Sequence, residues 1–186
     1  MTIDEVFTGI GRKMVEGLMF HSQLHDYFLF LGLKGYAESH KYHYFEESCN
    51  YKRMGCYYLK HFNKIIAEAG FTAPKVIPEG WGKYTRDDVN ASTRKNGIAT
   101  GFDRWIAWEK EVKKYYEQMY KELVNMDEVA AAAELLHYIK DVDGELATAH
   151  QKMLELKAID YNISDIIDEQ EDYYKCYKKK LKELEL

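Results

Sequence analysis

The feature that most constrains this chain is a set of four long amphipathic segments, each with one polar residue on its apolar stripe. Apolar side chains recur along these segments at intervals of three and four residues, which is typical of helices. The polar residues on the stripes are His21, Glu47, Glu109 and Asp143. Because carboxylates and imidazoles are seldom buried without a partner, the pattern indicates a shared polar site inside a helical bundle.

The same periodicity predicts a single all-α domain. The expected helices span residues 2–31, 36–69, 101–124, 127–157 and 162–184. Residues 70–100 hold both prolines, and we interpret this stretch as a long crossover that carries the chain along the bundle to begin again at the other end. We therefore expect an up-down four-helix bundle with a fifth, C-terminal helix.

Composition excludes several classes of protein. A length of 186 residues is enough for one domain with a hydrophobic core. With 46% apolar and 31% charged residues, the composition is that of a globular protein. A net charge of −5 without a basic tail gives no reason to expect a nucleic-acid partner. The three cysteines form no CxxC pair, and no apolar run approaches a membrane span, so we expect a reduced, cytoplasmic setting and no membrane contact.

Counting from the two tight turns predicts that the four polar residues lie at one depth. His21 and Glu47 stand at similar distances before and after a turn near residues 33 and 34, and Glu109 and Asp143 flank a turn near residue 125. Because a helix rises about 1.5 Å per residue, each pair matches in height within about one helical turn.

Neighbouring residues on the second helix extend the predicted site. Asn50 lies one turn beyond Glu47 on the same face, and His43 lies one turn before it. Residues three apart on a helix can share one metal, as in the Glu-x-x-His pairs of di-iron bundles, although here asparagine stands at the histidine position. Oxygen-rich ligand sets favour hard cations such as iron, manganese or magnesium.

In its helix pattern and in three short motifs, the sequence resembles the ferritin-like superfamily, which includes ferritins, bacterioferritins, rubrerythrins and the DNA-protecting mini-ferritins. The segment LKGYA at residues 33–37, followed by Glu46-Glu47, is similar to the second ferritin helix. EKEV at residues 109–112 resembles the glutamate-centred motif of the third helix, and YIKDVDGE at residues 138–145 is similar to the fourth bacterioferritin helix. With the helix order and the long crossover, the resemblance covers nearly the whole chain.

The resemblance implies a di-iron carboxylate site that oxidises Fe(II) with oxygen or peroxide, with iron storage or detoxification if the subunits form a shell. Two iron ions, or manganese, would lie between the helices, with Glu47 and Glu109 as bridging and terminal carboxylates. The family places a glutamate on the first helix, and the nearest one here is Glu16. The residues expected to hold metal are Glu47, Glu109, His21, Asp143, Asn50, His43 and Glu16.

Two alternatives stay open. The chain could be a non-catalytic ferritin-like scaffold or interaction protein in which the polar layer is structural, and the asparagine at position 50 favours this interpretation. The second helix also has an apolar line away from the bundle, which we interpret as a contact between copies of the chain, although it could instead pack under the fifth helix or the crossover. This line consists of Phe45, Cys49, Cys56, Leu59, Phe62 and Ile66.

Overall fold

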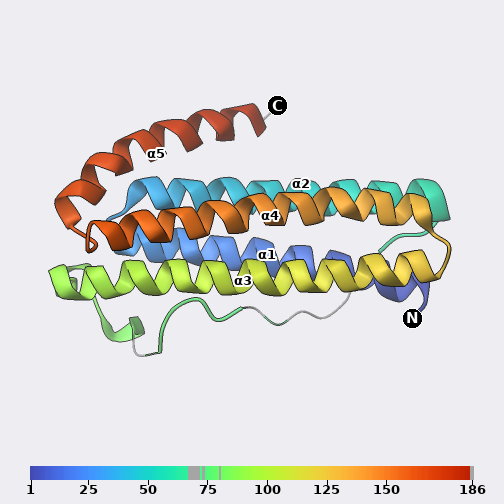
Figure 1. Cartoon of the computed structure of the whole chain (residues 1–186), viewed down its shortest axis with the longest axis horizontal. Coiled ribbons are helices and arrows are strands. Elements are labelled where there is room, and N and C mark those ends of the chain that lie inside the picture. The colour runs from blue at the N-terminus through green and yellow to red at the C-terminus, as the bar shows by residue number, and fades with distance from the viewer. Residues whose placement is uncertain (67–71, 73, 80, 185–186) are drawn as a thin grey trace.

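A computed structural model describes residues 1–66, 72, 74–79 and 81–184, and its architecture is an elongated helical bundle (Figure 1). No strand occurs among these residues, so the predicted all-α fold is confirmed. The helices are α1 (Ile3–Phe30), α2 (Lys34–Phe62), α3 (Ala91–Asn125), α4 (Val129–Ala158) and α5 (Ile163–Leu184). In the described residues no helix is long and apolar enough to cross a membrane.

Two antiparallel hairpins form the bundle. α1 packs along α2, α3 packs along α4, and α1 joins the hairpins by packing against α3. The helices α2 and α3 begin at the same end of the molecule, so the connection between them returns along the length of the bundle (Figure 1). Aromatic and aliphatic side chains from all four helices fill the interior, including Phe28, Phe102, Tyr116 and Tyr138.

Each hairpin turns at a residue in the left-handed backbone region. Gly32 has φ of 81° between α1 and α2, and Asp127 has φ of 63° between α3 and α4. Glycine adopts this conformation without the steric cost of a Cβ atom, and aspartate tolerates it better than most residues. These two turns set which residues of the paired helices lie at the same height.

The crossover is shorter than the sequence predicted. α2 ends at Phe62 because Asn63 takes the left-handed conformation, with φ of 53°. α3 begins at Ala91 rather than near residue 101, because the side chain of Asn90 accepts a hydrogen bond of 2.9 Å from the backbone N–H of Thr93. The predicted end of the second helix at residue 69 and start of the third at 101 were therefore wrong, and two 3₁₀ turns, Trp81–Lys83 and Arg86–Asp88, lie within the connection.

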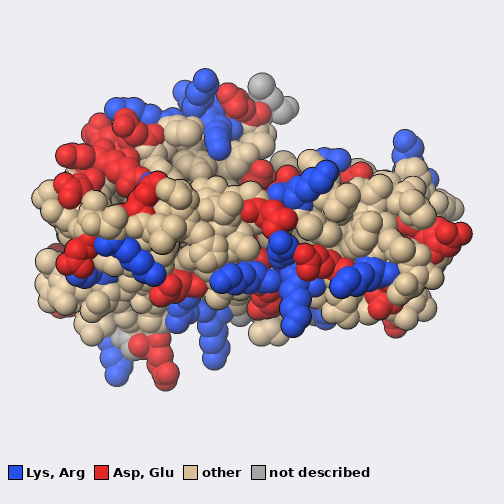
Figure 2. Space-filling view, in the orientation of Figure 1, with Lys and Arg blue, Asp and Glu red and all other residues tan. Residues whose placement is uncertain are grey.

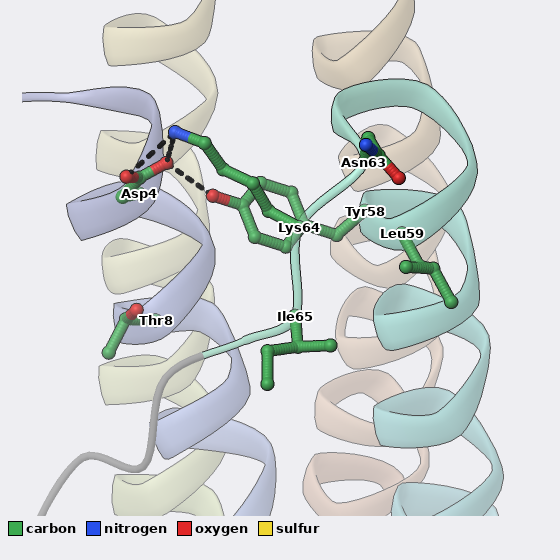
Figure 3. Close-up of a pocket in the computed structure, with 7 residues that line it drawn as sticks. All are labelled: Asp4, Thr8, Tyr58, Leu59, Asn63, Lys64 and Ile65. Carbon is green, nitrogen blue, oxygen red and sulfur yellow. Dashed lines mark hydrogen bonds and ion pairs between the residues drawn. The ribbon is translucent and has the colours of Figure 1, made fainter.

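The start of the crossover is tied to the first turn of α1 (Figure 3). Lys64 Nζ lies 2.8 and 2.9 Å from the two carboxylate oxygens of Asp4, and the Tyr58 hydroxyl donates to the same carboxylate. Leu59 and Ile65 line the shallow pocket beside this group. The polar contact fixes the exit from α2 against α1 at the end of the bundle remote from Gly32.

The fifth helix folds back and packs along the outer face of α2 (Figure 1). An ideal Cβ atom at Gly35 would lie 2.5 Å from the backbone oxygen of Gln170, so glycine permits this close approach. The Gln170 side-chain oxygen accepts a hydrogen bond of 3.0 Å from the backbone N–H of Tyr36. The N-terminal half of the outer face of α2 is therefore covered by α5.

The expected outer line of α2 divides into two parts. Phe62 packs on Phe7 with ring centroids 5.4 Å apart, and Ile66 contacts α1 at Gly11, so these two residues face the bundle rather than a second copy. Cys49, Cys56 and Leu59 are exposed, and Phe45 is half-buried. The prediction of an outward apolar line is wrong for Phe62, which packs on α1 at the last position of α2, and for Ile66, which lies beyond the end of the helix.

Two glycines of opposite conformation give a test of this backbone geometry. Gly32→Ala should lower the free energy of unfolding by about 1–2 kcal/mol, because a Cβ atom strains the left-handed turn. Gly55→Ala should raise it by about 0.5–1 kcal/mol, because Gly55 lies within α2 and its Cβ position meets nothing within 4 Å. Urea unfolding of both variants measures the two values, and equal effects of the same sign would contradict the assigned turn.

Candidate metal centre

Five side chains from all four bundle helices meet in the middle of the bundle, and we call them the His–Glu cluster. They are His21 of α1, His43 and Glu46 of α2, Glu109 of α3 and Glu145 of α4. They form two groups of three potential ligands, His21–Glu109–Glu145 and His43–Glu46–Glu145, and within each group the ligand atoms lie within 4.8 Å of one another. Glu145 belongs to both groups, so the two positions are adjacent.

The distances within the cluster are short enough for a shared cation. His21 Nε2 lies 3.6 Å from Glu109 Oε1 and 3.9 Å from Glu145 Oε2. His43 Nδ1 lies 3.1 Å from Glu46 Oε2 and 3.3 Å from Glu145 Oε2. His21 and Glu109 are only 1% and 2% exposed, so both lie out of reach of bulk water.

The hairpin turns explain why these residues are level. His21 and His43 are equally far in sequence from Gly32, and Glu109 and Glu145 are equally far from Asp127. Paired antiparallel helices that rise by the same amount per residue bring such positions to the same height. The cluster is therefore a direct consequence of where the two left-handed residues stand.

Two further residues hold the ligand side chains in place. His40, which is fully buried, has its Nδ1 atom 3.1 Å from Nδ1 of His21, so these two nitrogens share one proton in a hydrogen bond. This contact leaves Nε2 of His21 facing Glu109 and Glu145. Trp105 Nε1 donates a hydrogen bond of 3.0 Å to Glu109 Oε1. Partners of this kind orient the ligands of metal sites.

The buried carboxyl groups are held in an unfavourable environment for negative charge. Burial raises the pKa of Glu109 well above its ordinary value, the charge of Glu47 adds to this effect, and the bond from Trp105 only partly opposes it. Burial likewise raises the pKa of Glu145, and His43 only partly offsets the effect. A nearby cation would lower both raised pKa values, because it stabilises the charged carboxylates.

The histidines differ in the direction of their pKa shifts. Burial lowers the pKa of His21 well below its ordinary value, and the same is true of His40, so both imidazoles are neutral near pH 7. Burial also acts on His43, but the carboxylates of Glu145 and Glu46 outweigh it and raise the pKa of that ring. A neutral imidazole presents a free nitrogen lone pair, which is the form that binds metals.

Several buried atoms of the centre lack hydrogen-bond partners among the described residues. They include Glu145 Oε2, His40 Nε2 and the hydroxyl oxygen of Tyr116. Unsatisfied buried polar atoms cost free energy unless an ion or water pairs with them. A mixed set of imidazole nitrogens and carboxylate oxygens is suited to iron, manganese or similar divalent cations, so the residues present fit such an ion.

The structure places His21, His43 and Glu109 in the centre of the bundle, and their expected role as metal ligands stays a prediction. Glu47 lies one turn away from His43 on α2. Its half-buried side chain packs against α1, where an ideal Cβ atom at Gly17 would lie 2.7 Å from Glu47 Oε1. Glu47 lies outside both groups of three potential ligands, although its charge acts on Glu109. Its expected role as a metal ligand stays a prediction.

Asp143 is not part of the centre. Its side chain is 48% exposed and forms an ion pair of 2.5 Å with Lys113. The expected stripe on this helix was displaced by one residue, because the buried line runs through Leu135, Tyr138, Val142, Ala149 and Met153. A shift of one residue turns a helix by about 100°, which places Glu145 inward and Asp143 at the surface.

The remaining two predicted residues lie elsewhere. Glu16 forms an ion pair of 2.7 Å with Lys13 and lines a pocket beside the crossover, so the structure does not bring it to the cluster. Asn50 is half-buried one turn beyond Glu47 on α2. Its role stays a prediction.

Sequence reasoning missed Glu145, Glu46 and His40. Glu145 was placed off the stripe by the same phase error that placed Asp143 on it. His40 and His43 stand three residues apart on α2, a spacing that puts both on one helix face, and that signal was available in the sequence. Glu46 stands three residues after His43, so the same spacing pointed to it as well, and in the structure the two side chains lie 3.1 Å apart.

The raised pKa of Glu47 predicts how the metal-free protein responds to pH. Burial and the charges of Glu46 and Asp141 raise this pKa to about 8. As pH rises from about 4.5 towards 8, the unfolded chain loses this proton while the folded chain retains it, so the free energy of unfolding falls. In Glu47→Gln, the fall in the free energy of unfolding between pH 5 and pH 8.5 should be about 1–3 kcal/mol smaller than in the wild type, as measured by urea unfolding at the two pH values.

Glu171→Gln is the surface control, because the Glu171 side chain is 77% exposed, and it should show the same fall as the wild type. A fall in Glu47→Gln equal to that of the wild type would contradict the prediction.

Comparison with solved structures identifies the fold. A humanized archaeal ferritin is 15% identical and superposes with a TM-score of 0.74, with 94% of this chain and 98% of that chain covered. An open-pore ferritin from the hyperthermophilic archaeon Archaeoglobus fulgidus has the same identity and a TM-score of 0.70, with 94% and 96% covered. An engineered closed form of the Archaeoglobus fulgidus ferritin gives 0.72 over 94% and 97%.

Comparisons of sequence give no relative: neither the scan against family models nor the search of curated proteins found a match. At 15% identity, the likeness to solved structures establishes the fold and leaves the chemistry to the residues themselves. The chain is a ferritin-like four-helix bundle with a fifth helix.

Proposed function

We propose that this protein binds two divalent metal ions, with iron as the substrate, at two positions that share Glu145. The inner position would use His21, Glu109 and Glu145, and the outer position would use His43, Glu46 and Glu145. Manganese could occupy the same positions. The ferritin-like fold of the chain agrees with this proposal, since proteins of that fold in the comparison are ferritins.

The observation that carries the proposal is the shared carboxylate. Glu145 Oε2 is buried without a hydrogen bond, yet it lies 3.3 Å from His43 Nδ1 and 3.9 Å from His21 Nε2. A bridging carboxylate would offer one oxygen lone pair to each of two cations and share its single negative charge between them, and the two imidazoles would supply one nitrogen donor to each position. Among the described residues this oxygen accepts no hydrogen bond, so it has lone pairs available to a cation.

The proposed reaction is the oxidation of Fe(II) by oxygen or peroxide. Two ferrous ions would each give up one electron. These two electrons and two protons would reduce dioxygen to hydrogen peroxide. With peroxide as the oxidant, they would reduce it to two molecules of water. The elevated pKa values of Glu109 and Glu145 mean that metal uptake releases protons from these groups.

The chain's own residues prepare the site for this chemistry. His40 and Trp105 orient His21 and Glu109 through hydrogen bonds. Aromatic rings enclose the inner position: Trp105 packs against His40 with centroids 4.7 Å apart, and Phe20 packs against His21 at 5.3 Å. This apolar wall limits the access of water to the buried carboxylates.

Storage or detoxification of iron would follow if copies of the chain form a shell. The structures that share the fold are ferritins, and the exposed Cys49, Cys56 and Leu59 on the C-terminal half of α2 are the candidate contacts between copies. The alternative function is a scaffold without metal chemistry. Measuring metal binding distinguishes the two, because only the proposed function requires it.

Removal of metal should lower the stability of the folded protein. A ligand that binds only the native state at about 100 times its Kd adds about 2.7 kcal/mol. The melting temperature should therefore rise on addition of Mn(II) to the metal-stripped protein and return to the starting value when EDTA is added. An unchanged melting temperature at saturating Mn(II) would favour the scaffold.

Two acidic residues of α4 give a matched test of the site. Glu145→Ala should weaken Fe(II) binding at both positions by at least about tenfold, because it removes the shared ligand. Asp143→Ala should bind as wild type does, because Asp143 pairs with Lys113 at the surface. Anaerobic titration with Fe(II), monitored by isothermal calorimetry, measures the affinity of both variants. Circular dichroism checks that both are folded. Equal loss in the two variants, or loss only in Asp143→Ala, would sink the assignment.

A further inference from the structure

A pocket of about 280 Å³ connects the outer half of the His–Glu cluster with the surface. Its lining residues come from three helices: Tyr42, His43 and Glu46 of α2, Lys140, Asp141, Gly144, Glu145 and Thr148 of α4, and Tyr177 and Lys180 of α5. Three of these residues, His43, Glu46 and Glu145, make up one of the two ligand groups. The pocket therefore opens directly onto the outer metal position.

The inner part of the cluster is closed by contrast. His21, His40 and Glu109 are between 0% and 2% exposed. The indole of Trp108 stacks on Phe20 at 4.8 Å on that side of the bundle. A hydrated cation that reached the inner position through the described pocket would pass His43 and Glu145 first.

The fifth helix supplies one wall of this pocket. The ring of Tyr177 lies 5.8 Å from that of Tyr42 and 6.2 Å from that of His43. Lys180 Nζ lies 4.8 Å from the centroid of Tyr177 and 5.3 Å from that of Tyr42. The ammonium group is thus held against both aromatic rings that border the opening, by the attraction of a cation to a ring face.

Charge along α5 is strongly unequal. Its first half is acidic, with Asp165, Asp168, Glu169, Glu171 and Asp172. Its second half is mainly basic, with Glu183 as its one acidic residue against Lys175, Lys178, Lys179, Lys180 and Lys182. Figure 2 shows acidic side chains over the start of α5 and basic side chains gathered over its C-terminal half. Of the five basic residues, Lys180 is the one that lines the pocket.

We propose that this pocket is the port through which a divalent cation enters the centre, and that Lys180 slows cation entry by placing a positive charge at its mouth. This inference rests on the proposed metal site. Lys180 lies against the rings of Tyr42 and Tyr177, and the ring of Tyr177 lies 6.2 Å from that of His43, so the positive charge stands beside the outer ligands. A cation that enters must displace or pass the ammonium group.

The test is stopped-flow uptake of Co(II) by the metal-stripped full-length protein, followed by the visible absorbance of the bound ion. Lys180→Gln should raise the association rate about 3- to 10-fold at low ionic strength, and the difference should shrink in about 0.5 M salt, where charges are screened. Lys182→Gln removes the same charge from the same helix at an exposed position outside the pocket, and it should match the wild type.

A second variant separates the opening from the charge. Tyr177→Ala removes part of the wall without changing charge, so it should raise the association and dissociation rates together and leave the Kd of Co(II) within about twofold, as expected when only the barrier to passage changes. If Co(II) binds but Lys180→Gln and Lys182→Gln associate at the same rate, the port is wrong and the metal site stands. If the wild type takes up no Co(II), the proposed metal site fails and the port fails with it.

Discussion

The structure depends on how an apolar bundle accommodates ionisable side chains at its centre. Four ionisable side chains lie within a core that is otherwise built largely from aromatic and aliphatic side chains: Glu109, Glu145, His21 and His43. Removing carboxylates from water is costly unless a partner compensates, and here burial and mutual repulsion push their pKa values upward. A divalent cation would relieve both costs at once, which is why we propose that the arrangement is a metal site.

The level of the site follows from the two turns, which explains what the sequence could and could not predict. Apolar periodicity was sufficient for the all-α fold and for the inward positions of His21 and Glu109. Placing the turn centres one or two residues away from Gly32 and Asp127 was enough to match Glu47 with His21, although the structure pairs Glu47 with Gly17. Partners in a hairpin lie at equal distances on either side of the turn, so an error of about two residues at the turn centre moves the predicted partner by about four residues, roughly one helical turn.

Helix phase was the other source of error. On α4 two neighbouring lines are nearly equal in apolar character, and Leu136 and Leu154, which belong to the wrong line, are 38% and 63% exposed. Packing against α3 selects the line through Tyr138 and Val142, and Glu145 enters the centre with it. The cap formed by Asn90 and the close approach of α5 at Gly35 likewise depend on tertiary contacts. The position of α5 bears on the proposed entry pocket, because it places Tyr177 and Lys180 beside His43, Glu46 and Glu145.

The central claim is that Glu145 joins two metal positions, and anomalous X-ray scattering tests it most directly. Crystals grown anaerobically with Fe(II) would be measured above and below the iron absorption edge. The account predicts two peaks on either side of the Glu145 carboxylate, one beside His21 and Glu109 and the other beside His43 and Glu46. Peaks beside Glu47 and Gly17 instead, or none inside the bundle, would contradict it.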